Sequence, residues 1–187
     1  MRFDRQIQMP QIGPAGQSRL ARSSVTVVGA GGLGSPVLTY LACAGVGRLR
    51  VVDSDAVDES DLNRQFLYGA GELGRNKASA ACARLGADYP DVVFEPVSGR
   101  ITQEDPAALV GNPDLIVDCV DTIETRLAVN AYAMRAGIPL VEGGVAGFGG
   151  FVMAIDPDNA CLECVMPPVK LKEREFPVIG AAAGVIG

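Results

Sequence analysis

The fold is decided by the stretch Val25-Thr26-Val27-Val28-Gly29-Ala30-Gly31-Gly32-Leu33-Gly34. Its first four residues are apolar or β-branched, which is typical of a buried parallel strand. The spacing Gly29-x-Gly31-x-x-Gly34 then predicts a sharp turn into an apolar helix over 37–46. Glycine allows positive φ angles and lets backbone N–H groups approach an anion at a helix N-terminus. The stretch therefore predicts a binding site for a nucleotide phosphate.

A second apolar strand is predicted at Arg48–Val52 and ends in Asp53, 24 residues after Gly29. This is the place and the residue type of the acid that binds ribose hydroxyls in dinucleotide-binding folds. A glycine-rich turn with a purely structural role is the alternative. The order of strand, turn, helix, strand and acid favours nucleotide binding.

Strand and helix patterns alternate along the chain. Strands are predicted at 25–28, 48–52, 92–97, 115–121 and 138–141, and helices at 37–46, 74–88, 106–110 and 123–136. A longer strand with glycine bends is expected at 143–155. This order predicts an α/β fold, namely a Rossmann-like, doubly wound, mostly parallel sheet with a nucleotide-binding glycine loop.

With 187 residues, 48% of them hydrophobic, the chain can bury one substantial core. We expect a single domain over 1–187, with an N-terminal arm (1–24), a nucleotide-binding core (25–155) and a tail (156–187). The arm is expected to be irregular, with one short helix at 16–22 and charged residues too distant to pack on the core. The tail ends within an apolar stretch, which indicates a truncated C-terminus.

The composition of the chain excludes several classes of function. The net charge is −6 and the Lys and Arg residues are scattered, so no nucleic-acid surface is expected. Neither an apolar run of about 18 residues nor a signal-peptide core is found, so we expect no membrane contact and a cytoplasmic protein. The chain has no histidine, which removes imidazole as a general base. Cys43, Cys82 and Cys119 lie in apolar segments and are expected to be buried thiols.

Several separated motifs together resemble the ThiF/MoeB/HesA family, the bacterial and archaeal relatives of the ubiquitin-activating enzymes. The resemblance extends from Arg5 to Gly187. Its marks are Arg5-Gln6, the glycine loop, Asp53-Ser54-Asp55, Leu62-Asn63-Arg64-Gln65-Phe66, Gly74-Arg75-Asn76-Lys77-Ala78, Asp118-Cys119-Val120-Asp121 with Arg126, and Cys161-Leu162-Glu163-Cys164. A nicotinamide-dependent oxidoreductase, which is one alternative, would leave Arg64, Lys77 and Asp121 without a role.

The resemblance implies adenylation of a carboxylate by ATP and Mg²⁺, with release of pyrophosphate. The usual substrate is the C-terminal glycine of a ubiquitin-like sulfur carrier of the ThiS or MoaD type. A carboxylate is already ionised at neutral pH and needs no base, which suits a chain without histidine. Two alternatives remain open: adenylation of a small carboxylic acid in cofactor biosynthesis, and a catalytically inactive nucleotide-binding interaction protein.

The resemblance also implies residue roles. Arg64 and Lys77 contact the phosphates, and Asp121 holds Mg²⁺. Arg5 matches an arginine that the family inserts into the partner subunit's active site, so a homodimer is expected. The catalytic candidates are therefore Arg5, Arg64, Lys77 and Asp121. Arg64, Lys77 and Asp121 are also nucleotide-binding candidates, together with Gly29, Gly31, Gly32, Gly34, Asp53, Asp55, Asn63 and Gln65.

Each role has a structural alternative. Lys77 could be a solvated residue at a helix start, Asp121 could cap the following helix, and Arg5 could belong to a disordered arm. Arg126 is expected to make a structural ion pair. Asp61 stands where the family commonly has asparagine, and its negative charge should weaken nucleotide binding unless a metal or Arg64 offsets it.

Cys161 and Cys164 have the spacing of a zinc knuckle, but two thiolates do not complete a tetrahedral site. The family has a second pair downstream, so we favour a Zn²⁺ half site in a truncated chain. A two-cysteine remnant and a redox pair are the alternatives, and the redox pair is disfavoured because no helix is expected to open there. The loop at 172–177 has no cysteine, so no covalent enzyme thioester is expected at that loop.

Overall fold

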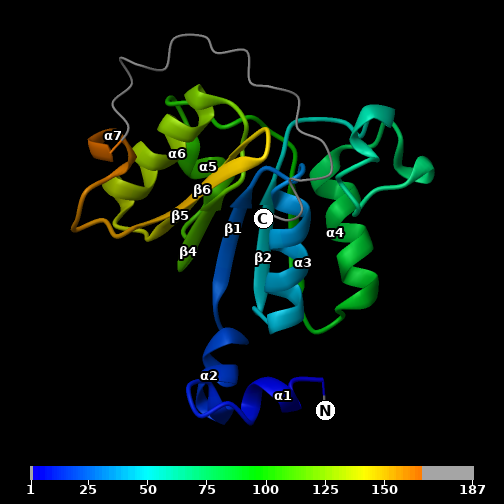
Figure 1. Ribbon diagram of the computed structural model, residues 1–187, viewed down its shortest axis with the longest axis vertical. Coiled ribbons are helices and arrows are strands. Elements are labelled where there is room, and N and C mark those ends of the chain that lie inside the picture. Colours follow the sequence, from blue (N-terminus) through cyan, green and yellow to red (C-terminus); the bar gives the residue numbers. More distant parts are fainter. Residues whose placement is uncertain (1, 166–187) are drawn as a thin grey trace.

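The computed structural model describes residues 2–165, and its centre is a six-stranded sheet (Figure 1). The strand order is β3-β2-β1-β4-β5-β6, which is the order of a doubly wound dinucleotide-binding fold. Neighbouring strands are parallel from β3 to β5, and β6 is antiparallel to β5. The predicted fold class is therefore confirmed. The strands are β1 (Ser24–Val28), β2 (Arg48–Val52), β3 (Val93–Val97), β4 (Leu115–Asp118), β5 (Leu140–Ala146) and β6 (Gly149–Ile155).

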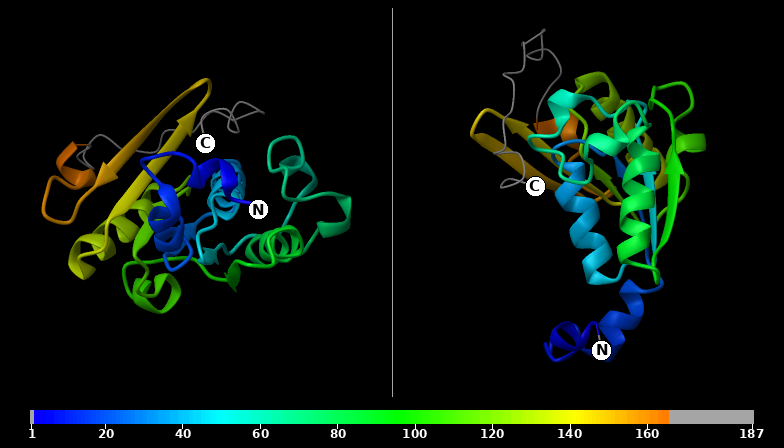
Figure 2. Two further views of the ribbon diagram at one scale, coloured as in Figure 1. Left: turned by 90° about the horizontal axis from the view of Figure 1, so that it is seen from below. Right: turned by 90° about the vertical axis from the view of Figure 1, so that its right-hand side faces the viewer.

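Two pairs of helices cover the two faces of the sheet (Figures 1 and 2). The alternate residues of β1 explain this arrangement, because Val25 and Val27 face one side and Val28 faces the other. Helices α3 (Gly34–Ala44) and α4 (Lys77–Asp88) pack on the first side. Helices α5 (Pro106–Val110) and α6 (Ile123–Ala136) pack on the second. Two short helical turns, η1 (Glu59–Asp61) and η2 (Ala70–Glu72), lie between β2 and α4, and a third, α7 (Leu162–Val165), follows β6.

The predicted strand at 143–155 is wrong, because this segment forms most of a β-hairpin. Strands β5 and β6 pair from Leu140 opposite Ile155 to Ala146 opposite Gly149. Gly147 has φ 61° in the turn between them, so the glycines allow the chain to reverse where bends in one strand were expected. The predicted strand at 115–121 is also too long, since β4 ends at Asp118. Asp121 therefore lies in an irregular segment after the strand.

The N-terminal arm is more ordered than predicted. It forms two helices, α1 (Asp4–Ile7) and α2 (Gly13–Leu20), which lie at the end of the molecule where the parallel strands begin (Figure 1). The Gln6 Nε2 donates to the Ala44 carbonyl at 3.0 Å, a C-terminal carbonyl of α3 that has no partner within its own helix. Arg2 donates to the Asp88 carbonyl at 3.1 Å. The arm and a charged residue in it thus pack on the ends of α3 and α4, contrary to expectation.

The cysteine prediction is correct at two positions and wrong at one. Cys82 and Cys119 are buried free thiols, whereas Cys43 is exposed. Cys43 follows Ala42, which packs in the core, and successive helical residues point about 100° apart. Its sulfur lies 2.9 Å from the Tyr89 hydroxyl. In residues 2–165 no helix is long and apolar enough to cross a membrane. The predictions for the end of the tail, including the loop at 172–177, lie outside the described residues.

Candidate active site

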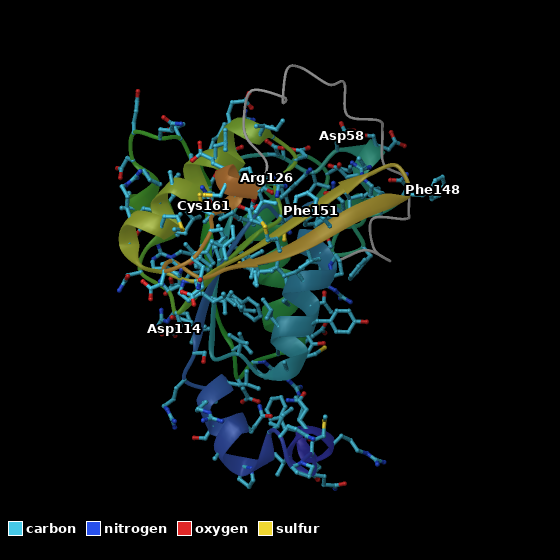
Figure 3. All side chains as sticks on the ribbon, turned by 60° about the vertical axis from the view of Figure 1, so that its left-hand side comes forward. Asp58, Asp114, Arg126, Phe148, Phe151 and Cys161 are labelled. Atoms are coloured by element: carbon cyan, nitrogen blue, oxygen red, sulfur yellow. The ribbon has the colours of Figure 1, made fainter. Side chains whose placement is uncertain are left out.

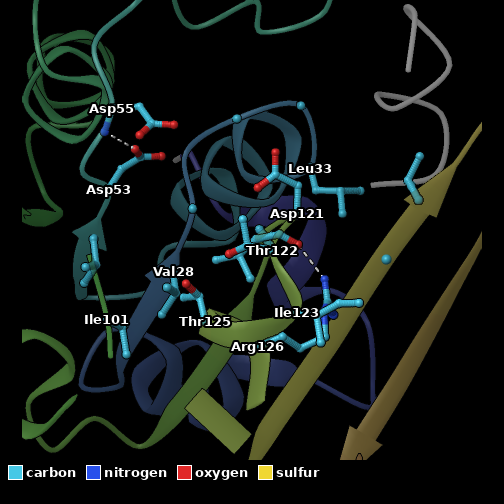
Figure 4. A pocket seen from close by; sticks show the side chains of 18 of the residues that line it. Val28, Leu33, Asp53, Asp55, Ile101, Asp121, Thr122, Ile123, Thr125 and Arg126 are labelled. Carbon is cyan, nitrogen blue, oxygen red and sulfur yellow. Dashed lines mark hydrogen bonds between the residues drawn. The ribbon is translucent and has the colours of Figure 1, made fainter. Parts of the chain in front are cut away.

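A cavity of about 860 Å³ opens where the parallel strands end (Figure 4). Its volume lies within the range of small-molecule sites, which is roughly 300–1,000 Å³. Most of the predicted site residues line it, although they come from separate segments of the chain. These residues are Gly29, Gly31, Gly32, Asp53, Asp55, Arg64, Gln65, Lys77 and Asp121.

The glycine loop is shaped by two close approaches of backbone. Gly29 has φ 92°, and a Cβ there would lie 2.8 Å from the Cys119 carbonyl oxygen. A Cβ on Gly34 would collide with the carbonyl of Gly29. Gly34 is buried and does not line the cavity. It therefore shapes the turn, while Gly31 and Gly32 present their backbone to the cavity.

Asp53 ties the glycine loop to the end of β2. Its Oδ2 accepts from the Ala30 N–H and its Oδ1 accepts from the Asp55 N–H, both at 2.8 Å. Burial raises the pKa of the Asp53 carboxyl, and these two N–H groups oppose that rise. Tyr68 adds a second tie, because its hydroxyl donates to the Ala30 carbonyl at 2.7 Å. The loop is thus held before any ligand arrives.

Lys77 is the first residue of α4, a position where the helix dipole disfavours a cation. The structure places its Nζ 3.0 Å from the Asp61 Oδ2, with only 9% of the lysine side chain and 8% of the aspartate side chain exposed. Asn76 caps the helix by accepting from the Ser79 N–H at 3.1 Å. The reading of Lys77 as a solvated helix-start residue is therefore wrong.

The Asp61 carboxylate is contacted by several residues of the surrounding motif. Its carboxylate accepts from Gln65 at 2.8 Å and from the Asp58 N–H at 3.0 Å, and the Arg64 guanidinium lies 3.4 Å away. With Lys77 and Arg64 nearby, one negative charge faces two positive ones. These three side chains together carry one net positive charge, so the charge of Asp61 is offset within the protein.

Asp121 projects from the segment between β4 and α6 (Figure 4). It is exposed, and in the described part of the chain its carboxylate has no hydrogen bond or ion pair. The N-cap residue of α6 is Thr122 and no side chain caps that helix, so Asp121 does not act as its cap. An unpaired carboxylate in a cavity suits a hard cation such as Mg²⁺, which takes oxygen ligands from one or two carboxylates, phosphates and water.

Arg126 makes the ion pair that was predicted for it. Its Nη1 lies 2.7 Å from the Glu142 Oε2 and 3.2 Å from the Asp118 Oδ2. The two carboxylates are completely buried, and they stand opposite each other on β4 and β5. Arg126 also lines the cavity, which the sequence analysis did not predict.

Some predicted residues lie away from the cavity. Arg5 is exposed on α1, at the opposite end of the parallel strands (Figure 1). Asn63 is exposed and accepts from Arg64 Nη1 at 3.0 Å, so it contacts the site indirectly.

The Cys161 and Cys164 sulfurs lie 3.6 Å apart as free thiols, near α6 (Figure 3). Helix α7 begins at Leu162, so the expectation that no helix opens at this pair is wrong. The Cys164 N–H lowers the pKa of the Cys161 thiol. Among residues 2–165 no group of three or more potential metal ligands is found, so the described residues offer only these two thiols to a metal ion.

Two groups of lining residues were missed by the sequence analysis. Arg100 and Ile101 come soon after β3, and the rule that ligands bind at the carboxyl ends of parallel strands would have identified them. Gly144 and Phe151 line the cavity from the β5–β6 hairpin. They were missed because this segment was predicted as one strand.

The sequence model of the ThiF family matches residues 3–187. The chain therefore belongs to the ThiF family, and the resemblance drawn from the motifs is confirmed.

Two curated relatives show how far this match extends. The SAMP-activating enzyme E1 of Haloferax volcanii is 42% identical over 166 residues, which are 89% of this chain and 62% of that protein. The sulfur carrier protein adenylyltransferase of Thermus thermophilus is 44% identical over 172 residues, which are 89% of this chain and 64% of that protein. The chain thus spans less than two thirds of either relative.

Solved structures confirm the fold. A crystal structure of Escherichia coli MccB with ATP matches 99% of this chain and 59% of that chain with a TM-score of 0.84. The identity is 24%, so this likeness concerns the fold.

Proposed function

We propose that the protein is an ATP-dependent adenylyltransferase. It activates the C-terminal glycine carboxylate of a ubiquitin-like sulfur carrier as an acyl-adenylate and releases pyrophosphate. The observation that carries the proposal is the division of charge in the cavity. Lys77 and Arg64 supply excess positive charge, whereas Asp121 offers an unpaired carboxylate. The names of the two relatives support the same activity.

The chemistry needs alignment more than acid–base catalysis. The carrier carboxylate attacks the α-phosphorus, an oxygen–phosphorus bond forms, and the bond to the pyrophosphate oxygen breaks. The ionised carboxylate gives up no proton in this step. The glycine loop and Asp53 hold the nucleotide, while Lys77 and Arg64 stabilise the charge that develops on pyrophosphate. Asp55, Asn63 and Gln65 complete this proposed nucleotide site.

The proposed metal is Mg²⁺, held by Asp121 together with phosphate oxygens and water. When bound, Mg²⁺ would neutralise phosphate charge. The exposed Asp121 carboxylate is a fitting ligand. A zinc ion at Cys161 and Cys164 is a weaker proposal, because thiolates from outside the described residues would have to complete the site.

Arg5 is proposed to act in a second subunit. The arm is docked at the far end of the sheet from the cavity, so Arg5 is remote from the site in its own chain (Figure 1). A homodimer would let each arm reach the other site. We also keep the single adenylation domain over 1–187 and the cytoplasmic location as predictions.

The proposed function is tested by ATP–pyrophosphate exchange with the purified protein. Candidate carriers ending in Gly-Gly are offered in one arm, and a panel of small carboxylic acids in another. We expect exchange that requires a carrier and is abolished by Asp121→Ala. Glu124→Ala, at an exposed residue in the first turn of α6, is the matched control and should retain exchange.

Two outcomes would contradict the proposal. Exchange with a small acid and with no carrier would assign the protein to small-molecule adenylation. ATP binding without exchange in any arm would favour a nucleotide-binding protein without catalytic activity.

A further inference from the structure

Three charged side chains lie beneath the cavity and have no role in the proposed reaction. Asp118 ends β4, Glu142 lies in β5 and Arg126 lies in α6. We call them the Arg126 triad. The Asp118 and Glu142 side chains are 0% exposed and Arg126 is 11% exposed. Burying charges is costly, so such a group must be nearly neutral and well bonded to persist.

The triad reaches neutrality if its two carboxylates share one proton. The Glu142 Oε1 and the Asp118 Oδ2 are both buried, and neither accepts a well-aligned hydrogen bond among the described residues, although the Arg126 Nη1 lies 3.2 Å from the Asp118 Oδ2. Burial, followed by the neighbouring Asp118, raises the pKa of Glu142 to about 10. A proton on Glu142 would satisfy both oxygens and leave one negative charge to pair with Arg126.

Arg126 connects this neutral group to the backbone around Asp121. Its Nη2 donates to the Val120 carbonyl at 2.5 Å and to the Gly143 carbonyl at 2.9 Å. The Val120 N–H donates to the Asp118 Oδ1 at 3.0 Å. The triad therefore holds residue 120 at both its N–H and its carbonyl, directly before Asp121.

Two further contacts support this arrangement. The glycine loop packs so closely on the segment that a Cβ on Gly29 would lie 2.8 Å from the Cys119 carbonyl oxygen. The Arg126 guanidinium itself lies 5.7 Å from the centre of the Phe151 ring in β6 (Figure 3). Since β4 has ended at Asp118, these contacts replace the sheet in fixing the backbone that carries Asp121.

We propose that Arg126 is a positioning residue, locked by Asp118 and Glu142, that sets the direction in which the Asp121 carboxylate enters the cavity. This inference rests on the proposed function, because it assumes that Asp121 acts in the reaction. If Arg126 only formed a structural ion pair, its replacement would lower the stability of the fold but would not change the alignment of Asp121.

The test is Arg126→Lys, which keeps the positive charge but has a single nitrogen, so it cannot fill both the Nη1 position at the carboxylates and the Nη2 position at the two carbonyls. We expect kcat for ATP–pyrophosphate exchange to fall by about tenfold to a hundredfold, because small misplacements of a reacting group have effects of this size. The KM for ATP should change less than kcat, since the glycine loop, Lys77 and Arg64 are untouched. Arg135→Lys, at an exposed position of the same helix, is the matched control.

A double-mutant cycle separates positioning from a structural role. If Arg126 acts through Asp121, Arg126→Lys should cause no further loss in the Asp121→Asn background. Three results would overturn the inference: losses of kcat that multiply in the double variant, a change in KM alone, or full activity of Arg126→Lys. Failure of the wild type to catalyse exchange would instead contradict the proposed function.

A second variant covers the case in which Arg126→Lys does not fold. Arg126→Gln retains an N–H donor for one carbonyl, and we expect the same dependence on Asp121. Unfolding in urea is measured for every variant, so that lost kcat is assigned only to folded protein. A folded Arg126→Gln whose loss multiplies with that of Asp121→Asn would also overturn the inference.

Discussion

Two groups of buried charges border the cavity, and they are built in opposite ways. The first, which we call the Asp61 cluster, has one carboxylate facing two cations, Arg64 and Lys77. The Arg126 triad has two carboxylates facing one cation. The Asp61 cluster retains positive charge where phosphates are proposed to bind. The triad is neutral when its two carboxylates share one proton, and a neutral, fully bonded group is suited to fixing backbone.

Burial of a charged side chain therefore does not by itself indicate whether that side chain binds a ligand or supports the fold. Lys77 and Arg64 are paired with the Asp61 carboxylate, and the phosphates of a polyanionic ligand can compete with that carboxylate for both cations. Arg126 is committed to backbone carbonyls as well as to Glu142. We therefore expect changes in the Asp61 cluster to alter nucleotide use, and changes in the triad to alter stability and alignment.

The largest effect is expected from Lys77→Met. Exchange should fall by roughly 10²–10³-fold, the usual loss when one donor to a developing charge is removed. Arg75→Met, at an exposed neighbour that does not line the cavity, should retain exchange. The measurement is the initial rate of ATP–pyrophosphate exchange with a carrier. Equal losses in both variants would show that Lys77 has no special role.

An effect of similar size, on stability, tests the proton in the triad. Asp118→Asn and Glu142→Gln should each be mild, because either leaves one carboxylate to balance Arg126. The double variant leaves the arginine without a counter-ion and should lower the free energy of unfolding by about 3–5 kcal/mol. Urea unfolding of all four proteins measures this. A double variant whose loss equals the sum of two mild losses would rule out the shared proton.

A pH effect follows from the same proton. Glu142 binds its proton more tightly in the folded protein, where its pKa is raised to about 10 from 4.5. The stability that this provides is complete below pH 4.5 and is lost as pH rises towards 10. The melting temperature of the wild type should therefore fall more steeply between these pH values than that of Glu142→Gln. Parallel curves would contradict the assignment.

The smallest effect is expected from Asp61→Asn. Removing a carboxylate near the phosphates should lower the KM for ATP by about fivefold, which corresponds to about 1 kcal/mol. The Gln65 Nε2 now faces Asp61, and a turn of the Gln65 amide would let its buried Oε1, which has no donor among the described residues, accept from the new amide. Glu59→Gln, an exposed change of equal charge, is the control. A raised KM for Asp61→Asn would mean that Asp61 organises the site.

Much of the fold was predictable because β1, the glycine loop and α3 follow local rules. Val25 to Val28 specify a buried strand, and the glycines specify the turn. The hairpin after Leu140 was not predictable in this way, because glycines are compatible with both a bend and a reversal. The docking of the arm depends on the carbonyl of Ala44, which is distant in sequence from Gln6.

The candidate site was partly predictable for the same reason. The motifs placed Asp53 and Asp121 at strand ends and Lys77 at a helix start, and the structure brings all three to one cavity. The pairing of Lys77 with Asp61 depends on how η1 lies against α4, and the pairing of Asp118 with Glu142 depends on strand register. Neither relation can be obtained from residue spacing.

The most direct test of the account is a crystal structure of the protein with Mg²⁺ and a non-hydrolysable ATP analogue. We expect the phosphates to lie over the glycine loop, with Lys77 Nζ within hydrogen-bond distance of a phosphate oxygen and Mg²⁺ on the Asp121 carboxylate. A nucleotide bound elsewhere, or one that leaves Lys77 paired only with Asp61 and Asp121 without a metal, would contradict it.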